Sequence, residues 1–165
     1  MIRDIVVATL AAYNETPKPA DCYKATEARL YAYPTLLSNI TQYQLDIQDL
    51  KKERITEKSK DITCWGGVSS RLTPEEKQQA RIMSVEIKLE RDKAEVSRID
   101  RVLHRLETSS EGIPAADFIR CVYMRGMDLD TIARQEDVSL STVQRRRTRL
   151  VRQLALMLYG AEALQ

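Results

Sequence analysis

Apolar residues recur at alternating intervals of three and four positions in two long stretches, residues 35–58 and 73–107. In the first stretch the repeat positions are Leu36, Ile40, Tyr43, Ile47, Leu50 and Arg54. In the second, which Asp92 interrupts, they are Ile82, Val85, Leu89, Val96, Ile99, Leu103 and Leu106. This spacing lines up side chains along one side of a helix. We therefore predict two long helices that form an antiparallel hairpin, part of a dimeric coiled coil, or an ordinary bundle core.

Proline and glycine divide the rest of the N-terminal half. Short helices are predicted at residues 2–13 and 22–32, separated by a linker that contains two prolines. Pro34 should end or kink the second of them, because proline lacks the backbone N–H that a helix interior uses. Residues 59–72 contain a glycine pair and a serine pair and are predicted to form a loop.

Capping residues mark the limits of two further elements. Thr73 is predicted to start the second long helix, with Pro74 at its first position and Glu76 completing a capping box. A short helix at residues 115–125 should end at Gly126. The side chains predicted to be buried on that helix are Phe118, Ile119, Val122 and Tyr123.

The C-terminal pattern is typical of a helix-turn-helix. Asp128 is expected to cap a helix at residues 129–135, in which the small side chain of Ala133 lets a second helix cross closely. Val138 is expected to be buried in the turn, and Val143 to be buried five positions later. Asp137 takes the place of the usual turn glycine, which is a mild departure because aspartate tolerates the left-handed conformation.

The second helix of this pair should begin after Ser139, which is predicted to cap it, and should carry a concentrated positive charge. Its buried side is predicted to hold Val143, Leu150, Leu154 and Met157 or Leu158. Its arginines are Arg145, Arg146, Arg147, Arg149 and Arg152, with no acidic residue before Glu162. Like charges at these spacings repel, so the arrangement favours a polyanionic ligand such as DNA.

The residues at the start of a recognition helix approach base edges first. The predicted base-reading side chains are Ser139, Ser141, Thr142, Gln144 and Arg145. Glutamine can pair with adenine and arginine with guanine. The predicted phosphate contacts are Arg146, Thr148, Arg149 and Arg152. Arg147 falls near the buried side, where we expect its stem to pack and its guanidinium to reach outward.

Composition and motifs argue against several other classes of function. Although 30% of the 165 residues are charged, the net charge is only +2, so any nucleic-acid signal must be local. Cys22, Cys64, Cys121 and His104 have no metal-ligand spacing, and we predict neither a metal nor another cofactor. No phosphate-binding glycine loop or catalytic motif is present, so the protein is not expected to be an enzyme. No apolar run is long enough to span a bilayer, and we expect a cytoplasmic protein without a membrane partner.

The segment "FIRCVYMRGMDLDTIARQEDVSLSTVQRRRTRLVRQLALML" resembles the region 4 helix-turn-helix of sigma-70-type factors. With "YPTLLSNITQYQLDIQDLKKE" and "TPEEKQQARIM" before it, most of the chain resembles phage-encoded transcriptional regulators of the ArpU and RinA type. The resemblance implies an all-α fold: an N-terminal helical region (1–72), a connecting or oligomerisation helix (73–110) and a DNA-binding domain (111–165). It also implies control of phage late genes in the bacterial host cytoplasm, through host RNA polymerase.

Three functions remain open on the sequence. The first is a transcriptional regulator that binds double-stranded DNA as a homodimer or higher homo-oligomer. The second is a phage small terminase subunit, which also combines a helix-turn-helix with helical oligomerisation elements but forms rings. The third is an interaction module whose basic amphipathic helix binds an acidic protein or a membrane surface.

Overall fold

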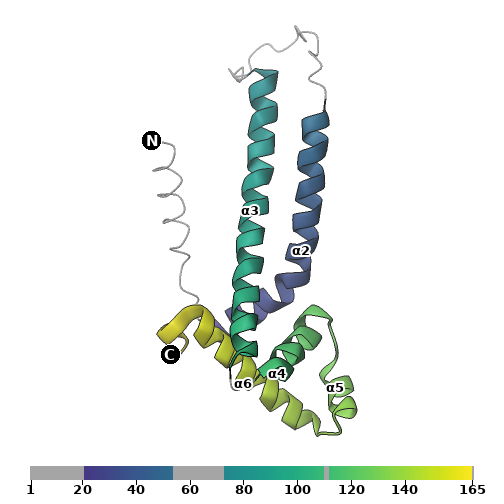
Figure 1. Cartoon of the computed structure of the whole chain (residues 1–165), viewed down its shortest axis with the longest axis vertical. Coiled ribbons are helices and arrows are strands. Elements are labelled where there is room, and N and C mark those ends of the chain that lie inside the picture. The colour runs from purple at the N-terminus through teal and green to yellow at the C-terminus, as the bar shows by residue number, and fades with distance from the viewer. Residues whose placement is uncertain (1–20, 54–72, 110–111, 165) are drawn as a thin grey trace, which may run out of the picture. The chain divides into compact units, whose positions relative to one another are not determined.

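The computed structural model describes residues 21–53, 73–109 and 112–164, and every regular element in these ranges is helical (Figure 1). The predicted all-α class is confirmed. The helix predicted at residues 2–13 and the loop predicted at 59–72 lie outside the described residues. Packing divides the chain into two compact units. One, the long-helix unit, contains described residues 31–53 and 73–105; the other, the C-terminal unit, contains 21–30, 106–109 and 112–164. Both long helices contribute residues to both units.

The first long helix, α2, runs from Cys22 to Lys52 with Pro34 inside it. Of the two predicted effects of Pro34, an end to the helix is therefore wrong, because α2 continues past it. A proline in a helix interior removes one hydrogen bond and costs about 3 kcal/mol or more. Burial on either side of it offsets this cost, since Leu30 and Ile47 are both buried. Tertiary packing thus outweighs a local preference.

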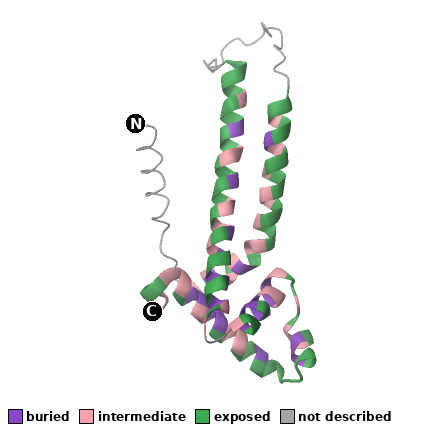
Figure 2. Ribbon diagram, in the orientation of Figure 1, coloured by how far each residue is buried: buried purple, intermediate pink, exposed green. Residues whose placement is uncertain are grey.

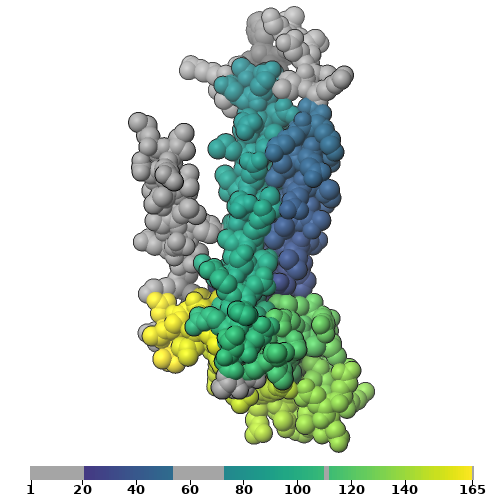
Figure 3. Space-filling view, viewed as in Figure 1, coloured from purple at the N-terminus to yellow at the C-terminus, as the bar shows by residue number. Residues whose placement is uncertain are grey.

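In the long-helix unit, α2 packs along α3 (Pro74–Glu107). The core between them contains Ile47, Ile82 and Leu89, flanked by Ile40, Tyr43, Leu50 and Val85. All of these are positions of the two predicted repeats, and Figure 2 shows that the buried residues gather where the helices face each other. Side chains of α2 and α3 touch along the pair in Figure 3.

Three polar contacts fix how α2 and α3 pair. The Gln78 side-chain amide donates to the Leu50 carbonyl, and Asn39 Nδ2 donates to Asp92 Oδ2 at 3.3 Å. The Tyr33 hydroxyl donates to Asp100 Oδ1 at 2.8 Å. The residue numbers of the bonded partners increase along α3 while they decrease along α2, so the helices are antiparallel. Asp92, the polar interruption of the repeat, is thus given a hydrogen-bond donor.

The predicted capping box starts α3. Thr73 N donates to Glu76 Oε2 at 2.7 Å, and Glu76 N donates to Thr73 Oγ1 at 3.2 Å. Pro74 is the first helical residue, as predicted. The box satisfies backbone donors that have no partner inside the helix.

The C-terminal unit contains α4 (Gly112–Ile119), a π-helical turn η1 (Arg120–Met124), α5 (Leu129–Gln135), α6 (Leu140–Tyr159) and η2 (Gly160–Leu164). The single helix predicted at residues 115–125 therefore begins earlier and widens into a π-turn. Its four predicted core residues, Phe118, Ile119, Val122 and Tyr123, are all buried. Gly126 follows the turn with a φ of 66°, a conformation that suits glycine, as its predicted role at the helix end requires.

A short turn joins α5 to α6. Asp137 adopts a φ of 53°, as predicted for the residue in place of the usual glycine. The Val138 N–H donates to the Ala133 carbonyl at 3.0 Å, and Ala133 is buried. The Val138 side chain, however, is 38% exposed, so the prediction that it is buried is wrong. Backbone hydrogen bonding and the Asp137 conformation hold this turn, and burial of Val138 is not needed.

Candidate nucleic-acid interface

The first turn of α6 is organised by three hydroxyl groups. Ser139 is the N-cap, as predicted, and its Oγ accepts from Thr142 N at 3.2 Å. The same oxygen lies 2.9 Å from Ser141 Oγ and 2.8 Å from Thr142 Oγ1. All three residues are exposed. By contrast, Asp128 is the N-cap of α5 by position but makes no side-chain capping bond there.

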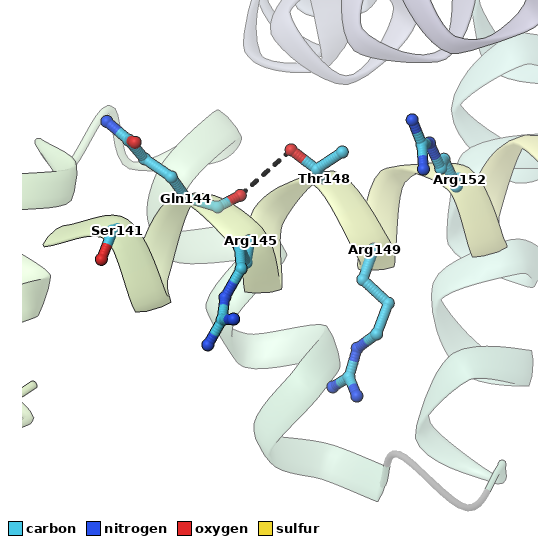
Figure 4. A pocket seen from close by; sticks show the side chains of 6 residues that line it. All are labelled: Ser141, Gln144, Arg145, Thr148, Arg149 and Arg152. Atoms are coloured by element: carbon cyan, nitrogen blue, oxygen red, sulfur yellow. Dashed lines mark hydrogen bonds between the residues drawn. The ribbon is translucent and has the colours of Figure 1, made fainter. Parts of the chain in front are cut away.

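The two sides of α6 differ sharply. Val143, Leu150 and Leu154 are at most 1% exposed and form the buried side, as predicted. On the outer side, a shallow open hollow of about 490 Å³ is lined by Ser141, Gln144, Arg145, Thr148, Arg149 and Arg152 (Figure 4). All six are predicted site residues. From Ser141 to Arg152 this surface extends along about 16 Å of helix axis, at 1.5 Å per residue.

The side chains in the hollow are ordered along the helix. Arg145 and Arg149 extend to the same side of α6, while Gln144 extends to the other (Figure 4). Thr148 Oγ1 donates to the Gln144 carbonyl at 3.0 Å, which ties its hydroxyl to the helix backbone. Three of the five side chains predicted to read bases therefore precede, on one continuous surface, three of the four predicted to contact phosphates. The other two, Ser139 and Thr142, do not line the hollow.

Arg146 is the predicted phosphate contact that the structure places elsewhere. Its Nη1 donates to both carboxylate oxygens of Glu136, at 3.0 and 2.9 Å, and its Nη2 donates to the Pro114 carbonyl at 3.3 Å. The guanidinium also lies over the Phe118 ring, 4.6 Å from its centroid. Arg146 thus joins α4, the turn after α5, and α6.

Arg147 also points away from the hollow. Its Nε lies 3.8 Å from Glu27 Oε1, and that nitrogen is buried. Its stem packs inside, as predicted, while the side chain as a whole remains 30% exposed. Burial lowers the pKa of the Arg147 guanidinium. Tyr123, Tyr23 and Glu27 together raise it by more than burial lowers it, so the pKa is above its ordinary value. The charges around Arg147, that of Glu27 among them, therefore offset the desolvation of its buried Nε.

The remaining charges leave the outer side of α6 positive. Arg145, Arg149 and Arg152 are exposed, and α6 contains no acidic residue. Two acids of the neighbouring α5 and turn are held by other arginines, since Asp130 pairs with Arg134 and Glu136 with Arg146. The hollow therefore presents three guanidinium groups together with the hydroxyl and amide groups of its first turns. Such a surface suits a polyanion that also offers hydrogen-bonding groups.

No local pattern in the sequence predicts that Glu27 and Phe118 contact α6. Glu27 belongs to the predicted N-terminal region, and Phe118 is predicted only as a core residue. Arg146 falls on the side facing α4, which a helical projection of α6 could have indicated. The pairing of Arg147 with Glu27 has no local signal.

Comparisons with protein-family models, with curated proteins and with solved structures returned no significant match. Among the described helices, none is long and apolar enough to cross a membrane. Within the same residues, no group of three or more histidine, cysteine, aspartate or glutamate side chains is placed to hold a metal ion.

Proposed function

We propose that this protein is a sequence-specific regulator of transcription that binds double-stranded DNA. In this proposal α5, its turn and α6 act as a helix-turn-helix, and α6 enters the major groove. The observation that carries the proposal is the hollow on α6. Six predicted site residues line it, three of them exposed arginines, on the side opposite the buried stripe of Val143, Leu150 and Leu154.

The position of each side chain suggests its role. Ser141, Gln144 and Arg145 lie in the first two turns, which approach base edges in this binding mode. Gln144 is suited to adenine and Arg145 to guanine. Arg149 and Arg152, further along, are suited to phosphates, with Thr148 between them. Ser139 and Thr142 hold the first turn in place through their hydroxyl groups.

Residues 118–158, which contain η1, α5 and most of α6, resemble sigma region 4, and most of the chain resembles regulators of the ArpU and RinA type. These resemblances support a narrower proposal. The protein would act on phage late genes in a bacterial host, together with host RNA polymerase. This part rests on sequence alone and is tested separately, by transcription from a bound promoter with purified polymerase.

We further propose that the long-helix unit mediates self-association. Five large hydrophobic side chains of α2 and α3 are between 44% and 66% exposed: Tyr31, Leu37, Leu45, Met83 and Ile87. A homodimer would place two recognition helices about 34 Å apart, one turn of the DNA helix. Mass measurement in solution tests this directly. A dimer supports the regulator, whereas a ring of about eight or more subunits would favour the small terminase subunit.

Selection of bound duplexes from a random DNA pool tests the main proposal. The regulator should enrich one motif, and in a dimer that motif should contain two related half-sites. Recovery of unenriched DNA would instead indicate a module for an acidic protein or another anionic surface.

A further inference from the structure

A polar cluster lies behind α6, on the side away from the hollow. The Tyr123 hydroxyl of η1 donates to Glu27 Oε1 of α2 at 2.7 Å, and the Tyr23 hydroxyl donates to the same oxygen at 3.2 Å. Arg147 Nε of α6 lies 3.8 Å from that oxygen. One carboxylate of α2 therefore gathers groups from η1, α2 and α6, all within the C-terminal unit.

The cluster is shielded from solvent. Tyr123 is 3% exposed, and the side chains of Glu27 and Arg147 are 21% and 30% exposed. Burial, and then the hydrogen bond to Glu27, raises the pKa of Tyr123, so its hydroxyl remains a donor over the physiological range. Because the pair is partly buried, little water screens the attraction between the Arg147 guanidinium and the Glu27 carboxylate. This attraction draws the two side chains together at 3.8 Å.

Arg147 and the DNA-facing arginines are on one rigid helix. With about 100° per residue, Arg147 lies roughly 200° around α6 from both Arg145 and Arg149. Side-chain atoms that lie about 6 Å from the axis of α6 would be displaced by about 2 Å if the helix rotated by about 20°. That displacement is enough to break a hydrogen bond to a base. A contact that restrains Arg147 therefore also restrains the direction of the hollow, in addition to the buried stripe of α6 and the Arg146–Glu136 pair.

We infer that Glu27 is a positioning residue for DNA reading: it sets the rotation of α6 through Arg147, and residues 22–30 of α2 act as a brace within the DNA-binding unit. This inference rests on the proposed function. Other contacts of the same segment support it, because Thr26 and Leu30 are buried and the Arg29 guanidinium lies 5.1 Å from the centroid of the Tyr159 ring of α6. Sequence specificity then depends on a helix far from the recognition helix in the chain.

The test compares variants of the full chain on two duplexes, the motif enriched by the wild-type protein and a scrambled copy. The ratio of the two affinities measures reading of bases, and the dependence of affinity on salt concentration measures phosphate contacts. We expect Glu27→Gln to lower the ratio at least fivefold with an unchanged salt slope. Tyr123→Phe should lower it in the same direction. The affinity ratio of the double variant Glu27→Gln/Arg147→Met should be no lower than that of the more impaired single variant. The reason is that the two substitutions remove the same interaction.

Two control variants separate positioning from general effects. Glu53→Gln, at an exposed residue just after the other end of α2, should leave the ratio unchanged. Ile119→Val, in the core of the same unit, should lower the melting temperature without lowering the ratio. All measurements are made well below every melting temperature.

Each contrary outcome is decisive. If Glu27→Gln lowers the affinity ratio less than fivefold, the inference is overturned. It is also overturned if Ile119→Val lowers the ratio as much as Glu27→Gln does when the two variants have the same fall in melting temperature. A salt slope reduced by about one in Arg147→Met would make Arg147 a direct phosphate contact instead. If the wild-type protein enriches no motif, the proposed function fails first, and the inference fails with it.

Discussion

Arg146 holds Glu136 by both carboxylate oxygens, with Nη1 3.0 Å from Oε1 and 2.9 Å from Oε2. Glu136 is the C-cap of α5, so this pair connects the turn directly to α6. The Arg146 side chain is 27% exposed, and its guanidinium also covers Phe118. The pair thus links the two helices, and it removes one arginine from the set that is predicted to contact DNA.

Replacing Arg146 with lysine tests whether its contacts with Glu136 and Phe118, and not only its positive charge, stabilise the fold. Lysine keeps the charge but lacks the planar group that bonds Glu136 and stacks on Phe118. We expect Arg146→Lys to lower the free energy of unfolding by about 1 kcal/mol, measured by urea denaturation. Arg145→Lys, on the exposed side, should leave it unchanged. Wild-type stability in Arg146→Lys would show that the cluster contributes little.

Arg149 should contact a phosphate. Arg149→Ala is expected to weaken binding to all DNA sequences and to reduce the salt slope by about one. Arg81→Ala, an exposed arginine of α3, is the matched control and should change neither. An equal effect of both substitutions would mean that charge alone, and not the place on α6, governs binding.

The cap of α6 should support the first turn of the hollow. Ser139→Ala removes the acceptor for Thr142 N and should cost about 1 kcal/mol. Amide hydrogen exchange at Thr142 should become faster, and affinity for the enriched motif should fall. Ser139→Asn, which can also cap, should largely retain both properties. Equal exchange at Thr142 in the alanine and asparagine variants would argue against the cap.

Asp137 tests the backbone of the turn. Its φ of 53° is unfavourable for residues other than glycine, and most of all for those branched at Cβ. We expect Asp137→Gly to leave thermal stability unchanged or raise it. Asp137→Val should lower the free energy of unfolding by about 1–2 kcal/mol. Were valine tolerated as well as glycine, the turn would have to adopt another conformation.

Features that depend on local pattern were predictable from the sequence. The repeats placed Ile47, Ile82 and Leu89 in one core, and the arginine spacing placed Arg145, Arg149 and Arg152 on one exposed side. These predictions succeed because helical periodicity alone decides which residues share a side.

Features that depend on long-range packing were not predictable. Tyr123 meets Glu27 across 96 positions of the chain, and nothing local to either residue indicates it. Pro34 stays inside α2 against its own preference, because the packing of the whole helix outweighs one lost hydrogen bond. The π-turn at Arg120–Met124 has no sequence signal that we can identify.

The most direct test of the central claim, that the outer side of α6 reads DNA, repeats the random-pool selection with Arg145→Ala. We predict that the enriched motif loses its preference at one base pair of each half-site and keeps the rest, at a cost of about 1–3 kcal/mol in discrimination. A motif identical to that of the wild-type protein would contradict the claim.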